Sequence, residues 1–303
     1  MSNLNYAHCP LRTNNTYSID LNGDSLIVRN HHEFKLTLND QHQYSMDVNE
    51  ETQSIITEAL FGAFKELATI TINNENISRY DFYQSPLLWL RSKEEEPEVI
   101  TQTGSISHPV RPHHFHGTHY RRFVPSIGKT ISFRTITLED LDTFHQWHNQ
   151  ERVSFFWELD KEREELKDYI IEGLEKKHQI PMIVEVDGVA TGYYEFYWVK
   201  EDRLGPYYQA RPYDRGFHFL IGEQSFLGKE NTAAILQSGL HFIYLDHLKT
   251  QFTMAEPRFD NNRVLKYADT LLGWQTLKVF DFPHKRAVLL ENSRDGFFKG
   301  ARL

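Results

Sequence analysis

Residues 212–246, PYDRGFHFLIGEQSFLGKENTAAILQSGLHFIYLD, decide the fold. The apolar run 216–222 predicts a strand, Gly228 predicts a turn, and the periodic apolar residues that follow predict a helix over 231–247. The first N–H groups of such a helix have no partner within it, so they bind anions together with the helix dipole. A glycine before a helix is more often a plain turn, and the neighbouring segments are needed to choose between the two interpretations.

The segments on either side predict a sheet of mostly antiparallel strands flanked by helices. Asp187-Gly188 joins two alternating segments and is a strong hairpin signal, and Thr137 opens a helix with a capping-box pattern. We expect strands at 131–137, 181–188, 190–199, 251–256 and on both sides of Pro283, and helices at 137–148, 158–177 and 260–271. The resulting order is β-α-α-β-β-β-α-β-α-β-β.

The first part of the chain differs in pattern and predicts a separate α+β domain over residues 1–104. Residues 16–48 alternate apolar and polar side chains around turns such as Asn22-Gly23, which is typical of a strand meander. A helix over 50–68 with Asn49 as its N-cap and a strand over 69–73 follow. This order permits a degenerate copy of the second half of the chain.

Residues 91–128 have the composition of a connector, with the acidic run 94–96 and four prolines. We expect a linker over 105–128 and a catalytic domain over 129–303. The histidines of this region suggest a metal site, but no regular element fixes their geometry and no cysteine lies nearby, so a solvated linker is the stronger expectation. These histidines are His108, His113, His114, His116 and His119.

Bulk composition indicates a globular protein and excludes several classes of function. The formal net charge of −9, from 42 acidic and 33 basic residues, argues against non-specific nucleic-acid binding, which requires a basic surface. The single cysteine, Cys9, cannot form an intramolecular disulfide. The sequence contains neither a signal-peptide pattern nor the run of about 18 apolar residues that a membrane helix needs. We therefore expect a cytoplasmic protein with no nucleic-acid or membrane partner.

Four ordered motifs carry a resemblance to a known family: YYEFYWVKEDRLGPYY at 193–208, PYDRGFHFLIGEQ at 212–224, EPRFDNNR at 256–263 and FDFPHKR at 280–286. Together with the element order, they resemble the siderophore hydroxamate acyltransferases of the GNAT superfamily, most closely the aerobactin-type N-hydroxylysine acetyltransferases. The resemblance covers residues 120–298. It implies a GNAT fold, which is a mixed, mostly antiparallel sheet flanked by helices, preceded here by an N-terminal α+β extension.

Two residues are the expected catalytic pair, His218 and Asp260. Period-two alternation places His218 opposite Phe217 and Phe219 on the strand, within an apolar run where a histidine needs a polar partner or a cavity. A buried core histidine would be the default interpretation, but the resemblance implies a general base at this position. Asp260 is placed to cap the next helix, and the resemblance implies a second role as the partner of His218.

The cofactor-binding residues follow from the GNAT resemblance. Its Arg/Gln-x-x-Gly-x-Gly/Ala turn binds the CoA pyrophosphate, and this chain keeps Gly228 but lacks the later glycines. The position of the family's tyrosine acid, before Gly273-Trp274, is Asp269, with Tyr267 nearby. The expected CoA-binding residues are Phe219, Leu220, Ile221, Leu227, Gly228, Lys229, Asn231, Thr232, Asn262 and Arg263.

The acceptor site is expected beside the aromatic strand 190–199. Glu195, Trp198, Tyr194 and Arg215 are the expected substrate-binding residues, although the core is the default location for most of this strand's rings. Arg203, Arg211 or Arg215 would pair with the carboxylate of a lysine-type acceptor.

The resemblance implies transfer of an acetyl group from acetyl-CoA to an N-hydroxylated amine, such as N-hydroxylysine or N-hydroxyputrescine. His218 would accept the proton, a backbone N–H near Leu220 would stabilise the oxyanion, and no metal would take part. A downstream siderophore synthetase is the implied partner. The alternatives are a succinyl-CoA donor, a GNAT enzyme for another amine such as an aminoglycoside or a protein, and a CoA-binding module without activity.

Overall fold

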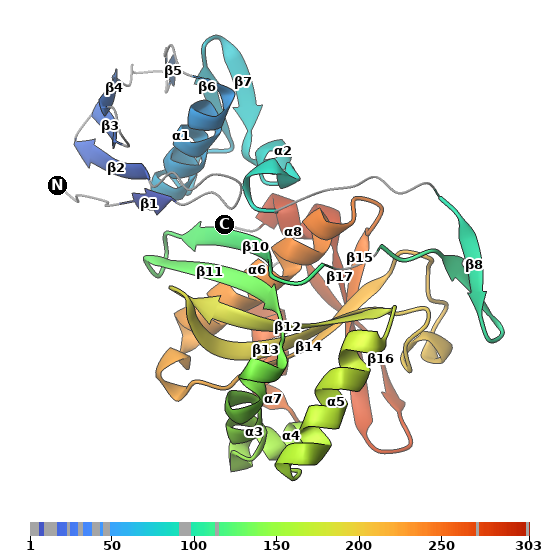
Figure 1. Cartoon of the computed structure of the whole chain (residues 1–303). Helices are drawn as coiled ribbons and strands as arrows, with labels where there is room; N and C mark the ends of the chain where they lie inside the picture. The colour runs from blue at the N-terminus through green and yellow to red at the C-terminus, as the bar shows by residue number, and fades with distance from the viewer. Residues whose placement is uncertain are drawn as a thin grey trace.

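The computed structural model describes residues 6–8, 17–22, 25–29, 33–37, 43–44, 49–90, 98–112, 115–270, 273–300 and 303 (Figure 1). Cys9, Gly23, the acidic run 94–96, His113 and His114 lie outside these residues. No helix in the described ranges is long and apolar enough to cross a membrane.

The body of the protein is a mixed sheet of eight strands in the order β10-β11-β12-β13-β14-β15-β17-β16. All neighbouring strands in it are antiparallel except β14 and β15, which run parallel. The strands are β10 (Thr118–Val124), β11 (Lys129–Thr135), β12 (Gln179–Val186), β13 (Val189–Trp198), β14 (Arg215–Ile221), β15 (Phe252–Ala255), β16 (Trp274–Asp281) and β17 (Arg286–Ser293). This is the mostly antiparallel sheet that the sequence predicts.

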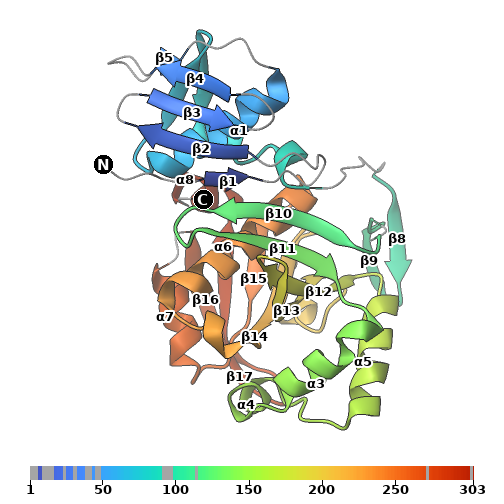
Figure 2. The same cartoon turned by 60° about the vertical axis from the view of Figure 1, so that its left-hand side comes forward.

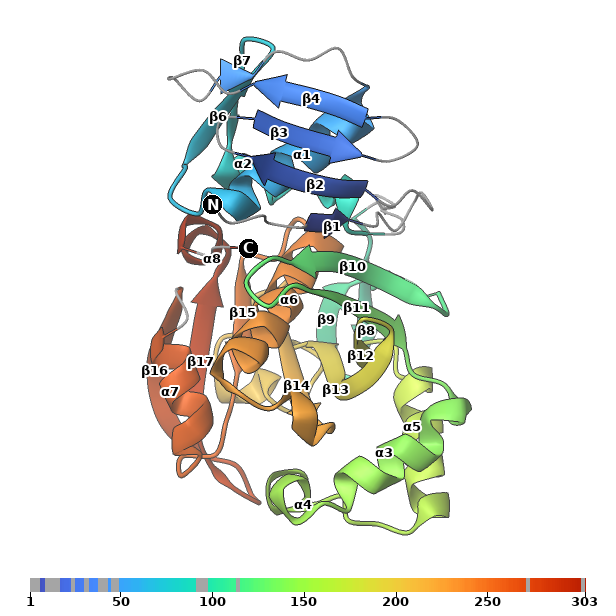
Figure 3. The ribbon, with the colours of Figure 1, turned by 90° about the vertical axis from the view of Figure 1, so that its left-hand side faces the viewer.

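Helices cover both faces of this sheet (Figure 3). On one face lies α6 (Lys229–Asp246), on the other lie α3 (Leu141–His148) and α5 (Arg163–Glu175). The remaining helices of this part are η2 (Leu138–Asp140), α4 (Glu151–Trp157), η3 (Gly205–Tyr207), η4 (Gln224–Phe226), α7 (Asn262–Thr270) and α8 (Arg294–Gly300). Phe217 and Ile221 pack in the core that contains α6, and Leu220 packs in the core on the other face, which confirms the alternation expected along β14.

Local signals in the sequence account for several element boundaries. The Thr137–Asp140 capping box is formed, and Asp187 and Gly188 both have positive φ, as the turn between β12 and β13 requires. The helix expected over 158–177 is shorter, because Glu158 adopts a left-handed conformation that ends α4 and the Glu162–Glu165 capping box then starts α5. The structure thus places α5 within the expected range and adds α4, a helix that the sequence did not predict, before it.

The N-terminal elements pack beside the edge strand β10 (Figure 2). They comprise β1 (Tyr6–His8), β2 (Tyr17–Asn22), β3 (Ser25–Arg29), β4 (Glu33–Thr37), β5 (Gln43–Tyr44), α1 (Glu50–Ala63), β6 (Thr69–Ile72), β7 (Glu75–Ser78), α2 (Arg79–Phe82) and η1 (Pro86–Leu88). The expected cap is present, since the Asn49 side chain accepts from the Thr52 N–H at 2.9 Å. Apolar residues of α1, such as Ile56 and Leu60, share one core with the eight-stranded sheet.

The region expected to be a linker contains regular structure. β8 (Ile100–Thr103) and β9 (Ile106–Pro109) form a hairpin, and β10, which starts at Thr118, is the first strand of the main sheet. His108 and His119 are buried rather than solvated, because each ring is hydrogen-bonded: His108 to Thr103 and the Pro109 carbonyl, His119 to the Phe115 carbonyl and Thr135. Composition alone did not reveal this, because His108 and His119 lie within β9 and β10.

Gly192 on β13 provides a test of the packing beside β14. A Cβ at this position would lie 2.2 Å from the Leu220 carbonyl oxygen, and backbone atoms cannot move aside cheaply. Gly192→Ala is therefore expected to destabilise the protein by about 1–3 kcal/mol in chemical denaturation.

Gly173→Ala on α5 is the matched control. Its Cβ would meet side-chain atoms no closer than 3.7 Å, and alanine favours a helix over glycine by up to about 1 kcal/mol. Equal stability of Gly192→Ala and the wild type would contradict the close strand contact.

Candidate active site

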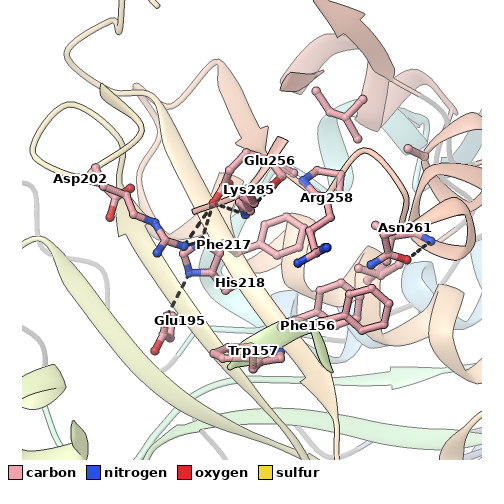
Figure 4. A pocket seen from close by; sticks show the side chains of 18 of the residues that line it. Phe156, Trp157, Glu195, Asp202, Phe217, His218, Glu256, Arg258, Asn261 and Lys285 are labelled. Carbon is pink, nitrogen blue, oxygen red and sulfur yellow. Dashed lines mark hydrogen bonds and ion pairs between the residues drawn. The ribbon is translucent and has the colours of Figure 1, made fainter. Parts of the chain in front are cut away.

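A cavity of about 540 Å³ lies where β14 and β15 separate (Figure 4). The two strands are paired only at Arg215–Thr253 and Gly216–Met254. Phe217 and Phe219 line the cavity from the α6 face of the sheet, and His218 lines it from the other face. The cavity therefore passes through the plane of the sheet at the opening between the two strands.

The separation of the strands also determines where the backbone of β14 points. The Val199 N–H donates to the Asp214 carbonyl, so the antiparallel register with β13 directs the backbone groups of residues 214, 216, 218 and 220 toward β13. Those of Phe217, Phe219 and Ile221 face the opening. The Leu220 N–H, expected near the oxyanion, thus faces β13, and Phe219 is the neighbour whose N–H faces the cavity.

His218 lies between two buried carboxylates. Its Nδ1 is 3.0 Å from Oε2 of Glu195, and its Nε2 is 2.7 Å from Oε1 of Glu256. A carboxylate only accepts hydrogen bonds, so this arrangement favours an imidazolium that donates from both nitrogens. Glu195 lies opposite His218 on β13, and Glu256 follows the last residue of β15.

The pKa values of these groups follow from the pairing. Burial would lower the pKa of His218, but the charges and hydrogen bonds of Glu256 and Glu195 outweigh it and raise that pKa to about 9. Burial opposes ionisation of Glu256 and Glu195, yet His218 holds the pKa of each below its usual range. The array therefore carries an imidazolium and two carboxylates at neutral pH.

Further side chains fix the two carboxylates. Hydroxyls of Tyr169 and Tyr193 donate to Oε1 of Glu195, and that of Tyr197 donates to Oε2 of Glu256 at 2.9 Å. Lys285 Nζ lies 3.8 Å from the Glu256 carboxylate, and Arg203 Nη2 lies 3.7 Å from it. The three hydroxyls and two cations leave the carboxylates little freedom to turn away from the imidazole.

Asp260 occupies a different place from the one expected. Its carboxylate is exposed and accepts from Arg258 at 3.1 and 3.2 Å, and the expected contact with His218 is not formed. The carboxylate that faces His218 from this segment is Glu256, four residues earlier in the same EPRFDNNR motif. Glu256 follows a buried strand directly and points back into the sheet opening, whereas Asp260 lies beyond the turn.

Of the residues expected at the acceptor, Glu195 and Arg203 line the cavity, and Tyr194, Trp198, Arg211 and Arg215 do not. Trp198 is buried between the guanidinium groups of Arg111 and Arg215, each 4.1 Å from its ring. Arg215 is paired with Asp246, and Tyr194 donates to the Ile235 carbonyl in the α6 core. The period of the strands explains this, because Tyr194 and Trp198 lie on the face of β13 opposite Glu195, and Arg215 lies on the face of β14 opposite His218.

The expected cofactor residues group at the ends of β14, α6 and α7. Gly228 has φ of 143°, which a non-glycine residue adopts only with strain, and it immediately precedes α6. Lys229 is exposed there, Leu227 and Asn231 are half-buried, and Thr232 is buried. Phe219 lines the cavity, Leu220 and Ile221 are buried, and Asn262 and Arg263 lie exposed at the start of α7.

The sequence did not point to Arg152 of α4, which lies at the C-terminal end of β14. Its guanidinium donates to the carbonyls of Ile221 and Gly222 at 2.7 and 2.6 Å. Burial and the charge of nearby Arg263 lower its pKa. Two arginines thus lie near the end of β14, in a region where an anion would be stabilised.

The apolar part of the cavity extends between α6, α7 and β16. Its walls are Leu236, Leu240, Val264, Tyr267, Ala268 and Trp274. Tyr267, which the sequence placed near the family's acid position, thus lines this part of the cavity.

Comparison with known proteins places the chain in a family. Residues 137–282 match the model described as acetyltransferase (GNAT) domain. The chain is 36% identical to an N(6)-hydroxylysine O-acetyltransferase of Escherichia coli, over 75% of this chain and 73% of that protein. It is 34% identical to a putative lysine N-acyltransferase of Schizosaccharomyces pombe, over 74% and 68%. An N(5)-hydroxyornithine transacylase of Beauveria bassiana is 36% identical over 63% of this chain, which spans only 43% of that longer protein.

Solved structures agree on the fold. An uncharacterised protein from Bacillus halodurans superposes with a TM-score of 0.58 at 30% identity, over 60% of this chain and 93% of that one. An aminoglycoside acetyltransferase in complex with coenzyme A superposes with a TM-score of 0.51 at 20% identity, over 56% and 98%, and is a likeness of fold alone. The chain is therefore an acyltransferase of the GNAT family, in the same group as the acyltransferases of hydroxylysine and hydroxyornithine.

Proposed function

We propose that the protein transfers the acetyl group of acetyl-CoA to the nitrogen of an N-hydroxylated amine, forming a hydroxamate for siderophore synthesis. The observation that carries this proposal is His218, held between Glu195 and Glu256 where a cavity crosses the sheet, in a chain whose relatives are acyltransferases of hydroxylysine and hydroxyornithine. A siderophore synthetase in the cytoplasm would then use the product.

The donor is proposed to enter from the α6 and α7 side. The apolar walls Leu236, Leu240 and Val264 suit the pantetheine chain, and the first N–H groups of α6 with Lys229 suit the pyrophosphate. The thioester carbonyl would then reach the opening of the sheet. There, the Phe219 N–H would stabilise the oxyanion of the tetrahedral intermediate.

The acceptor is proposed to enter from the opposite side, where His218, Glu195 and Tyr169 lie. An alkylhydroxylamine is much less basic than a primary amine, so it arrives neutral and its nitrogen can attack directly. The new C–N bond forms first and gives the tetrahedral intermediate, and collapse of this intermediate then breaks the C–S bond. The proton of the attacking nitrogen passes to the Glu195–His218–Glu256 array, and the leaving thiolate takes a proton in turn.

Two alternatives have specific structural requirements. A succinyl donor would need a cation for its free carboxylate near the sheet opening, and Arg203 and Lys285 are placed there. Both of these cations already face Glu256, which favours the acetyl donor. A CoA-binding module without activity would have no need of a paired, buried imidazolium, whose burial costs free energy.

The first test is thiol release from acetyl-CoA with hydroxylated amines and their parents. N6-hydroxylysine, N-hydroxycadaverine and N-hydroxyputrescine are compared with lysine, cadaverine and putrescine. We expect strong turnover with at least one hydroxylated amine and little with its parent. Equal rates with the parents would overturn the proposed acceptor, and the product's ferric complex identifies the acylated atom as nitrogen.

Replacing the imidazole separates its chemical role from donor binding. His218→Ala is expected to lower kcat by roughly 10²–10⁴-fold, the range of general acid–base catalysis, and to leave acetyl-CoA affinity nearly intact. Calorimetric titration with CoA measures the affinity. A fully active variant would remove His218 from the mechanism.

The pH dependence tests the pairing with Glu256. If the array must lose the His218 proton to accept one, kcat/KM rises through neutral pH toward about pH 9, since that is where His218 deprotonates. Glu256→Gln removes the charge that raises this pKa, so the rise is expected to move to lower pH.

Asp260→Asn is the matched control for that shift. Asp260 is exposed and paired with Arg258, so the pH profile of this variant is expected to follow the wild type. A shifted profile in Asp260→Asn with none in Glu256→Gln would restore the Asp260–His218 pairing that the sequence predicted.

A further inference from the structure

The outer end of the cavity contains charged groups that the reaction does not use. Lys176, His178, Gln179 and Asp202 line it, at the end of α5 and in the turn after β13. It lies on the acceptor's side of the sheet opening, away from α6 and α7. Its chemistry therefore concerns the part of the acceptor that is distant from the reacting nitrogen.

Asp202 supplies a carboxylate to this end (Figure 4). Its Oδ1 accepts from the Leu204 N–H at 3.0 Å, and within the described part of the chain no cation forms a salt bridge with it. Burial and the charge of Glu256 raise its pKa, against the opposing effects of His218 and Arg203. A half-buried carboxylate without a salt-bridge partner is a favourable contact for the cation of a ligand.

Lys176 supplies a cation to the same end. Its side chain is exposed, and Nζ lies 6.0 Å from the centre of the Tyr169 ring. The Tyr169 hydroxyl donates to Glu195, which in turn accepts from His218. One phenol ring and one carboxylate thus lie between Lys176 and the imidazole.

His178 lies close to both charges. Burial lowers its pKa, the carboxylate of Asp202 opposes this effect, and the ammonium of Lys176 adds to it. Its ring is therefore neutral at neutral pH and adds no charge to the pair. Asp202 and Lys176 thus present opposite charges around an uncharged imidazole.

We propose that this outer end binds the α-ammonium and α-carboxylate of an amino-acid acceptor, with Asp202 contacting the ammonium and Lys176 the carboxylate. The inference rests on the proposed function, and it assigns the acceptor to hydroxylated amino acids over hydroxylated diamines. Trp157, Leu159 and Tyr169 enclose the aliphatic chain between this end and His218. A diamine lacks the carboxylate and so leaves Lys176 without a partner, next to a substrate of like charge.

N6-hydroxylysine and N-hydroxycadaverine are a matched pair of acceptors, because they differ only in the carboxylate. The wild type is expected to prefer N6-hydroxylysine in kcat/KM. Lys176→Ala is expected to raise the KM for N6-hydroxylysine roughly tenfold with kcat little changed, the size of one charge-assisted contact. It is expected to lower the KM for N-hydroxycadaverine, so the preference between the two falls by more than tenfold.

Two further variants complete the experiment. Asp202→Asn is expected to raise the KM for both acceptors, because both carry the distant ammonium. Lys177→Ala removes the neighbouring exposed lysine, which does not line the cavity, and is expected to behave as the wild type. Thermal melting of each variant confirms that it is folded.

The outcomes separate this inference from the function on which it rests. Absence of turnover with every hydroxylated amine would remove the proposed function itself. Turnover with a preference for N-hydroxycadaverine, or a Lys176→Ala effect equal for both acceptors, would overturn the amino-acid site and leave the acyltransferase proposal standing.

Discussion

The rest of the site depends on one constraint, which is that the backbone pairing between β14 and β15 stops near the start of β14. Two register pairs join these strands, and after Gly216 they separate. Continued parallel pairing would use the backbone groups of Phe217 and Phe219 for the sheet and would close the space beside His218. Because the pairing stops, side chains from both faces of the sheet line one cavity, and a donor and an acceptor can meet there from opposite sides.

The charges at the opening hold together because none of them is buried alone. Burying an unpaired carboxylate or imidazolium costs several kcal/mol, and here each charged group contacts a group of opposite charge or a hydroxyl. Burial raises the pKa of Tyr193 and Tyr197 well above the usual value, so both hydroxyls stay protonated and remain donors throughout. A proton can therefore enter or leave His218 while its two carboxylate partners keep their positions.

The sequence predicted the caps and turns that depend on local signals. It also predicted which side chains share a face of a strand where apolar and polar residues alternate. The Asn49 cap, the Asp187-Gly188 turn and the alternation along β14 all depend on neighbouring residues, and the structure confirms them. The order of strands and helices that resembled GNAT enzymes is also confirmed, with α4 and α8 as helices that the sequence did not predict.

The carboxylate partner of His218 could not be predicted from such local signals. Glu256 and Asp260 stand in one short motif, and only the path of the chain after β15 decides which of them faces the histidine. The prediction of three acceptor residues was wrong for a related reason. Tyr194, Trp198 and Arg215 lie on strands that border the site, but on the faces that turn away from His218. Strict use of the period in β13, counted from Glu195, would have separated Tyr194 and Trp198 from the face that carries Glu195.

The core shared by α1, β10 and α6 has a consequence for the unit that folds. His241 on α6 is hydrogen-bonded to the Tyr83 carbonyl at 2.8 Å and to the Tyr120 hydroxyl at 2.9 Å, and the Trp89 indole donates to Glu58 of α1. These groups are buried, so removal of residues 49–90 would expose apolar surface and leave one nitrogen of the His241 ring without its partner. The helix that carries the proposed phosphate site at its N-terminus is thus also held by the N-terminal elements at His241, in its C-terminal half. The orientation of α6 at the cavity therefore depends on residues 49–90 as well as on the strands of the main sheet.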